Sequence, residues 1–187
     1  KIGRTSLELE RFTVFETGAQ LLVDNMYSVA PPQDVYFRGR VRELPNSIAV
    51  LAFPERGAAR GIINDDAGVW LLAGNSGHSA PGLTNRRINL ETELQGKPFN
   101  CGTEQIARDV LDLLPSSGEG VPETASIPTN VTHTARVAVE TDYEYYAMFG
   151  NVDAANTYMA DLFAYASTVY EREVNTNLVI SWSRLWT

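Results

Sequence analysis

The chain has 187 residues, of which 44% are hydrophobic and 20% charged, a composition typical of globular domains. Fifteen Lys and Arg residues against 23 Asp and Glu give a formal net charge of −8. This acidic balance argues against a nucleic-acid or anionic membrane surface, because phosphate binding requires clustered cations. No apolar run approaches the ~20 residues that span a bilayer. One cysteine, Cys101, excludes an internal disulfide framework.

Residues 5–74 are rich in short apolar or alternating runs, which predict strands. Turns are expected at Gly18, at residues 45–47 and at residues 54–57. Residues 59–74 predict a hairpin around the sequence Asp-Asp-Ala-Gly at 65–68. Strands and turns at this spacing favour a β-sandwich or barrel-like module.

A helix and a linker are expected to follow this β-rich part. Residues 75–102 are irregular and polar, and residues 103–114 have one apolar face behind the possible N-cap Thr103. Pro115 ends that helix. Residues 115–134 are rich in Pro, Ser, Gly and Thr, which is linker composition. The predicted domains are therefore 1–114, which is β-rich with a terminal helix, and 135–187, joined by the linker 115–134.

The last domain reads as a strand, a helix and a second strand. The strands are "ARVAVET" and "NLVISWSRLW", and the helix between them has a broad apolar arc behind Asn151 or Asp153 as N-cap. A parallel sheet that is buried on both faces needs more than two strands. We therefore expect this unit to be incomplete, with further strands after Thr187.

The common catalytic templates are missing from the sequence. It contains no GxGxxG, GxxxxGK[ST], GxSxG or HExxH motif. His78 and His133 fall in loop-like segments without metal-ligand spacing, so they are interpreted as solvated loop residues.

An acidic and aromatic stretch follows the first strand of the last domain. If the strand continues, its alternation places Glu140, Asp142 and Glu144 on one side, an arrangement that suits a hard cation. The competing interpretation, which we favour, is a solvated strand end with charges at a helix start. The neighbouring tyrosines are interpreted as packing residues.

Cys101 stands in the sequence "KPFNCGTE", with Pro98 before it and Gly102 after it. A thiolate there could coordinate a catalytic zinc and displace the reactive water, while Pro98 and Gly102 shape the loop. The competing interpretation is a small buried hydrophobic residue. Asn130 begins the only N-x-S/T sequon and is a candidate glycosylation site.

Three stretches together resemble the precursor of a reprolysin-like (adamalysin, peptidase family M12B) zinc metalloprotease. "VRELPNSIAVLAFPERGAARGIINDDAGVWLL" is similar to the propeptides of this family. "PFNCGT" is similar to its P-x-x-C-G-V cysteine switch, with Thr103 in place of valine. "RVAVETDYEYYAMFGN", the helix after it and "NLVISWSRLW" resemble the opening strand, helix and strand of the catalytic domain, most like microbial and algal-type members.

This resemblance implies an α+β fold, in which a β-rich propeptide module precedes the β-α-β opening of a metzincin-type catalytic domain. It also implies a secreted precursor that binds zinc in its full length, with Cys101 as the zinc-blocking thiolate. The sequence departs from the family pattern at Arg136, where many animal members carry a calcium-binding glutamate. The zinc motif HExxHxxGxxH is absent, so the chain as given is not catalytic by itself.

Two alternatives remain open at this level. The first is a non-catalytic interaction module with protease-like architecture, in which Trp182 and Trp186 are interface residues. The last strand would then be covered by a partner protein or by the β-rich module, because an exposed edge invites aggregation. In the precursor, the cover would be the rest of the catalytic domain. The second alternative is a cleaved propeptide that acts as an inhibitor.

Overall fold

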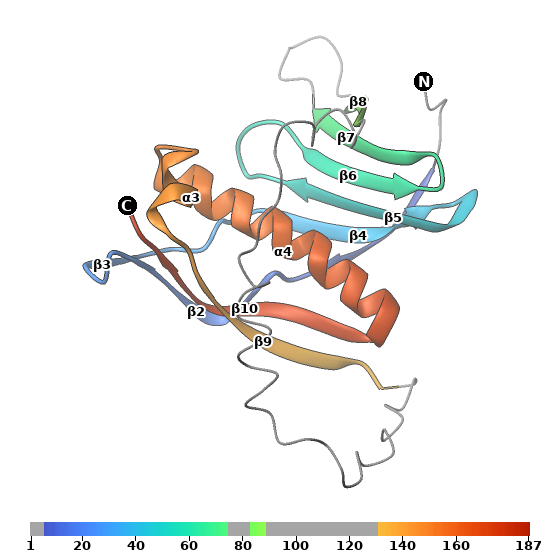
Figure 1. Cartoon of the computed structure of the whole chain (residues 1–187). Helices are drawn as coiled ribbons and strands as arrows, with labels where there is room; N and C mark the ends of the chain where they lie inside the picture. Colours follow the sequence, from blue (N-terminus) through green and yellow to red (C-terminus); the bar gives the residue numbers. More distant parts are fainter. Residues whose placement is uncertain (1–5, 75–82, 89–130) are drawn as a thin grey trace, which may run out of the picture. The chain divides into compact units, whose positions relative to one another are not determined.

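The computed structural model describes residues 6–74, 83–88 and 131–187 (Figure 1). The chain divides into two units, of which the first holds residues 1–88 and 132–187 and the second the remainder. The fold of the first unit is described below. Its described residues are mostly β with two helices, which confirms the predicted α+β class at this level. Among the described residues, no helix is both long and apolar enough to cross a lipid bilayer.

The strands that the structure describes in the first unit form two sheets. The six-stranded sheet is antiparallel, with the strand order β1-β4-β5-β6-β7-β8. Its strands are β1 (Leu7–Phe12), β4 (Val35–Val41), β5 (Leu44–Phe53), β6 (Arg60–Asp65), β7 (Gly68–Gly74) and β8 (Leu83–Ile88). The four-stranded sheet has the order β3-β2-β10-β9. Its strands are β3 (Tyr27–Val29), β2 (Phe15–Val23), β10 (Thr176–Leu185) and β9 (His133–Glu140).

Helix α4 (Val152–Val174) lies between the two sheets (Figure 1). Asn151 caps its start by accepting from the Ala154 N–H at 2.9 Å, and Asn175 ends it in the left-handed conformation. The helix has small buried side chains, such as Ala160 and Ala164, and these allow the strands of both sheets to pack close to the helix backbone. One apolar core joins α4 to both sheets and consists of Val14, Tyr36, Ile48, Val50, Ala52, Met159, Ala160, Ala164 and Ile180.

Several predicted elements are confirmed. They include the alternating strand β4, the β6–β7 hairpin, the long helix α4 with Asn151 as its cap, and the strands β9 and β10. Strand β8 lies in a region that the sequence indicated as irregular. His133 was expected in a loop but is the first residue of β9.

Two predicted turns are wrong. Gly18 lies inside β2 and has a φ of +83°. The pairing of β2 with β10 changes register between Phe15 and Gln20, so the strand forms a bulge at this point and does not turn. The turn expected at residues 45–47 falls earlier, between Val41 and Leu44. The Ser47 hydroxyl fixes that turn, because it accepts from the Val41 N–H at 2.8 Å and donates to the Leu44 carbonyl at 2.6 Å.

Strand β10 has a neighbour on each side, and this decides what covers the last strand. It pairs in parallel with β9 and also in parallel with β2. Strand β2 of the β-rich part therefore lies along the edge of β10 that the sequence left open, and the predicted partners stay predictions. In the four-stranded sheet, β9 and β3 are the outer strands. Most of the expected linker 115–134 lies outside the described residues, so its role as a domain boundary stays a prediction.

Candidate functional site

The site of interest is the contact between two parts of the chain. We call residues 6–88, as far as described, the N-terminal β segment, and residues 131–187 the βαβ segment. Their main-chain contact is the β2–β10 pairing, extended by a bond from the Ile180 N–H to the Val14 carbonyl at 2.8 Å. The Asp24 N–H likewise donates to the Leu185 carbonyl at 3.1 Å. The two segments therefore share one sheet as well as one core.

A second contact is a polar group that we call the Arg60 cluster, which consists of Asp34, Tyr36, Arg60 and Asp161. Arg60 on β6 donates from Nε to Asp161 Oδ2 at 2.5 Å and from Nη2 to Oδ1 at 2.8 Å. It also pairs with Asp34, which immediately precedes β4. The Tyr36 hydroxyl donates to Asp161 Oδ1 at 2.9 Å. Because Asp161 lies on α4, the cluster joins the helix to two strands of the N-terminal β segment.

Burial and charge affect the titration of this cluster. Burial raises the pKa of Tyr36, and the nearby Asp161 carboxylate raises it further, so the phenol stays neutral. Burial works against the charged form of Arg60. The hydrogen bonds to Asp161 and Asp34 outweigh it and raise the pKa of the guanidinium above its ordinary value. The cluster is therefore held by charge-assisted bonds that are partly shielded from water.

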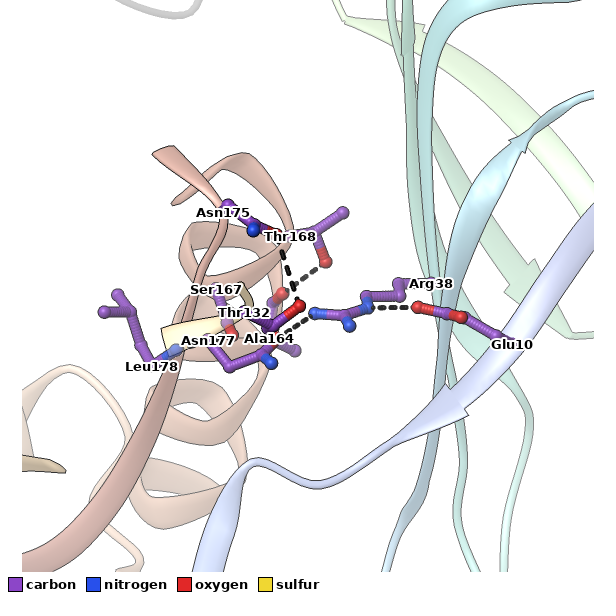
Figure 2. A network of polar contacts seen from close by, with 9 residues as sticks. All are labelled: Glu10, Arg38, Thr132, Ala164, Ser167, Thr168, Asn175, Asn177 and Leu178. Atoms are coloured by element: carbon purple, nitrogen blue, oxygen red, sulfur yellow. Dashed lines mark hydrogen bonds and ion pairs between the residues drawn. The ribbon is translucent and has the colours of Figure 1, made fainter. Parts of the chain in front are cut away.

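A third contact centres on Arg38 of β4, whose residue surface is only 8% exposed. Figure 2 shows the side chain reaching from the six-stranded sheet toward β10. Its Nε donates to Glu10 Oε1 at 2.8 Å, and its Nη1 donates to Asn177 Oδ1 at 2.5 Å. On the βαβ side, the Ser167 hydroxyl accepts from the Leu178 N–H at 2.9 Å and so ties α4 to β10 (Figure 2). Arg38 thus adds a partly buried polar bond between the two segments.

The predicted interface residues Trp182 and Trp186 flank an arginine on β10. The Arg184 guanidinium carbon lies 5.0 Å from the Trp182 ring centre and 5.3 Å from that of Trp186. Glu140 pairs with Arg184 at 3.2 Å and accepts from the Trp186 indole N–H at 2.9 Å. Both tryptophans are half-buried. The structure therefore brings Glu140 together with both of them, and their role as an interface stays a prediction.

The three acidic residues of the predicted cation site have separate surroundings. Strand β9 ends at Glu140, so the alternation that would align them does not continue. Asp142 instead caps the short helix α3 (Tyr143–Ala147) by accepting from the Tyr145 N–H at 2.8 Å, and Glu144 lies in its first turn. Within residues 6–74, 83–88 and 131–187, no group of three or more His, Cys, Asp and Glu side chains could hold a metal ion. The described residues do not fit a zinc centre.

The remaining predicted site residues lie outside the described ranges. These are Cys101, Pro98 and Gly102 of the candidate switch, the glycosylation candidate Asn130, His78, and the helix expected at 103–114. Arg136, where the sequence departs from the family's calcium site, lies on β9 and pairs with Glu16 of β2 at 2.8 Å. This exposed ion pair is a further link between the two segments.

Residues 131–184 match the reprolysin-like metallo-peptidase family M12B. The match begins two residues before β9 and ends one residue before the end of β10, so it coincides with the β9–α4–β10 unit. This part of the chain is therefore a metallopeptidase-related region, from a family that is generally zinc-dependent. A search of curated proteins finds no match.

Sequence reasoning missed the Arg60 cluster. Asp161 lies between Ala160 and Leu162 in the helix, so the one available signal was a carboxylate close to an apolar arc. Arg60 begins a strand in a hairpin and carried no signal of a distant partner. Only the packing of α4 against the six-stranded sheet shows that these side chains meet.

Proposed function

We propose that the βαβ segment is the opening part of a secreted zinc metalloendopeptidase domain, and that the N-terminal β segment belongs to its propeptide. The observation that carries this proposal is the coincidence of the family match with β9–α4–β10, together with the extension of that same sheet by β2. A propeptide is expected to contact the enzyme that it precedes in the chain.

The first role of this propeptide would be to support folding. Strand β2 occupies an edge of β10 that would otherwise be open, and open edges promote aggregation. The shared core and the Arg60 cluster hold α4 against the six-stranded sheet. In this way a βαβ unit with only two strands of its own gains β2 as a third parallel strand, and its helix gains the six-stranded sheet as a packing surface.

The second role would be latency, with Cys101 as the thiolate that blocks a catalytic zinc. Pro98 and Gly102 would shape the loop that carries it. The described residues supply no set of zinc ligands, so the metal and the catalytic base would be held by another segment of the precursor. We derive no catalytic step from the residues of this chain.

The test is the replacement Cys101→Ala in the full-length precursor, with Ser116→Ala as a matched control in the expected linker. We expect Cys101→Ala to raise the basal hydrolysis of a fluorogenic peptide before any processing, in a manner abolished by a zinc chelator. The control should behave as the wild-type precursor. Unchanged basal activity and unchanged access of chelators to zinc would refute the latency role.

The second candidate function is a non-catalytic interaction module. It is favoured by the compact unit that the two segments form and by the half-buried tryptophans beside Arg184. Because both edges of β10 are paired, a partner would then pair with the outer strand β9 or bind at the two tryptophans. Intact mass and zinc content of the protein from its native source separate the two candidates. A mass near 20.6 kDa without zinc favours the module, and a larger mass with about one zinc per chain favours the protease.

A further inference from the structure

A cavity of about 430 Å³ lies between α4 and strands β5–β7, and the roles proposed above do not use it. Aliphatic side chains of the strands form most of its wall. On the helix side the wall is Tyr158, Leu162 and Tyr165, which follow one another along one face of α4. Leu162 is 50% exposed and Leu71 of β7 is 37% exposed, so the cavity is open to solvent on the apolar side. Its volume lies in the range of small-molecule sites.

One end of the cavity is polar and adjoins a cluster of charged side chains whose formal net charge is negative. Arg60 and Asp161 line this end, and Asp34 pairs with the same guanidinium. Two carboxylates against one guanidinium leave one negative charge in the Arg60 cluster at neutral pH. An anionic ligand would therefore be repelled there, whereas a cation would be attracted through a medium less polar than water.

The aromatic residues in the wall also favour a positively charged ligand. Three tyrosines, Tyr36, Tyr158 and Tyr165, line the cavity. The hydroxyls of two of them are engaged, because Tyr36 donates to Asp161 and Tyr165 accepts from the Asn64 amide at 3.0 Å. Aromatic rings attract cations, and organic ammonium ions are commonly recognised by several aromatic residues together with a carboxylate. An apolar wall next to such a group suits a ligand with an apolar body and a cationic end.

We propose that this cavity binds an organic ammonium ion with an apolar body, such as an arylalkylammonium compound. The apolar body would lie along the aliphatic wall near Leu71 and Leu162. The ammonium group would lie at the polar end, near Asp161 and the tyrosines. This site is independent of the protease proposal, which rests on Cys101 and the strand pairing, so a failure of one leaves the other standing.

The experiment titrates the 187-residue chain with three isosteric probes, namely phenylpropylamine, phenylpropanol and phenylpropanoate, by calorimetry or by NMR shifts. We expect the amine to bind with a dissociation constant about tenfold lower than that of the alcohol, and the carboxylate to bind more weakly than both. Equal binding of amine and alcohol would mean a plain apolar crevice and would overturn the proposal. Preference for the carboxylate would overturn it as well.

Two variants test whether the probe binds in the cavity. Tyr158→Leu keeps an apolar wall but removes one ring, so binding of the amine should weaken about fivefold while binding of the alcohol changes less than twofold. Leu162→Trp, at an exposed helix position, should fill the cavity and abolish binding of both. The control is Tyr170→Leu on the same helix, outside the cavity lining. Thermal unfolding verifies that each variant folds. Unchanged amine binding in folded Leu162→Trp would show that the probe binds elsewhere.

Discussion

Arg60 and Asp161 lie 101 positions apart in the sequence, yet the guanidinium makes two parallel hydrogen bonds to the carboxylate, at 2.5 and 2.8 Å. This pair joins the six-stranded sheet to the helix of the metallopeptidase-related region. Both side chains are about 30% exposed, at 28% and 32%, so water screens the pair only in part. The contact gives a direct way to test whether the two segments stabilise each other.

Replacing Arg60 with Ala should lower the free energy of unfolding by about 3 kcal/mol, because it leaves the Asp34 and Asp161 carboxylates without their shared cation. Arg60→Lys should recover only part of this loss, since an ammonium group lacks the planar fork of donors. Urea denaturation measures both values. The control is Arg172→Ala, whose exposed pair with the adjacent Glu173 and exposed 3.3 Å hydrogen bond to the Asn46 carbonyl should together contribute less than about 1 kcal/mol. Equal losses for Arg60→Ala and Arg172→Ala would contradict the importance of the cluster.

Ile180 on β10 is fully buried in the core shared by both sheets and α4. Ile180→Ala should cost about 3 kcal/mol through lost contacts and a residual cavity. Val174→Ala, at a position 46% exposed, serves as the control and should cost less than about 1 kcal/mol. Because the core is shared, circular dichroism and tryptophan fluorescence should follow one transition in the wild type. Two separate transitions for the described segments would argue against a common core.

Two glycines with positive φ differ in the space around them. A Cβ atom at Gly39 would lie 1.9 Å from the Glu8 carbonyl oxygen of β1, whereas nothing lies within 4 Å of a Cβ at Gly18. Gly39→Ala should therefore force β1 and β4 apart and cost about 3 kcal/mol. Gly18→Ala should cost only about 1 kcal/mol, through its positive φ. Thermal unfolding of the two variants decides the comparison, and the reverse order of the two losses would show that the β1–β4 register is wrong.

Alkaline pH should destabilise the fold through Tyr145. Burial raises the pKa of Tyr145 to about 12, and its hydroxyl donates to the Ala155 carbonyl at 2.8 Å. The folded pKa thus lies above the unfolded value of about 10. The contribution of Tyr145 to stability is therefore fully present below pH 10 and is lost between pH 10 and about 12. Urea denaturation at several pH values measures this loss, and absorbance at alkaline pH follows phenol ionisation.

Variants at two tyrosines assign that pH dependence. Tyr145→Phe should lower stability at neutral pH by about 1 kcal/mol, since it removes a hydrogen bond, but should make the alkaline loss shallower. Tyr170→Phe, at a position 51% exposed, should change neither. An alkaline loss that is as steep in Tyr145→Phe as in the wild type would assign the effect to other groups, with Tyr36 the first to examine because its pKa is also raised.

Local patterns were sufficient for elements whose own residues decide their structure. An alternating run predicted β4 as a strand, although the structure buries Tyr36 and Arg38 rather than their apolar neighbours. A four-residue turn identified the β6–β7 hairpin, and an apolar arc behind Asn151 identified α4. The match to a metallopeptidase family was likewise predictable, because it rests on β9, α4 and β10, which are continuous in the sequence. The patterns failed at Gly18 and at residues 45–47. There the choice between a turn and a bulge depends on the neighbouring strand or on the side chain of Ser47.

By itself, the sequence determined the long helix α4, several of the strands and the family to which the last segment is related, because periodicity and capping act over a few neighbouring residues. Only the tertiary structure decided that β2 lies beside β10, that Arg60 meets Asp161, and that a cavity remains between α4 and β5–β7 beside the Arg60 cluster. These relationships join residues that lie far apart in the sequence. They depend on how apolar faces pack and on which buried charges must then be paired, and no local pattern contains that information.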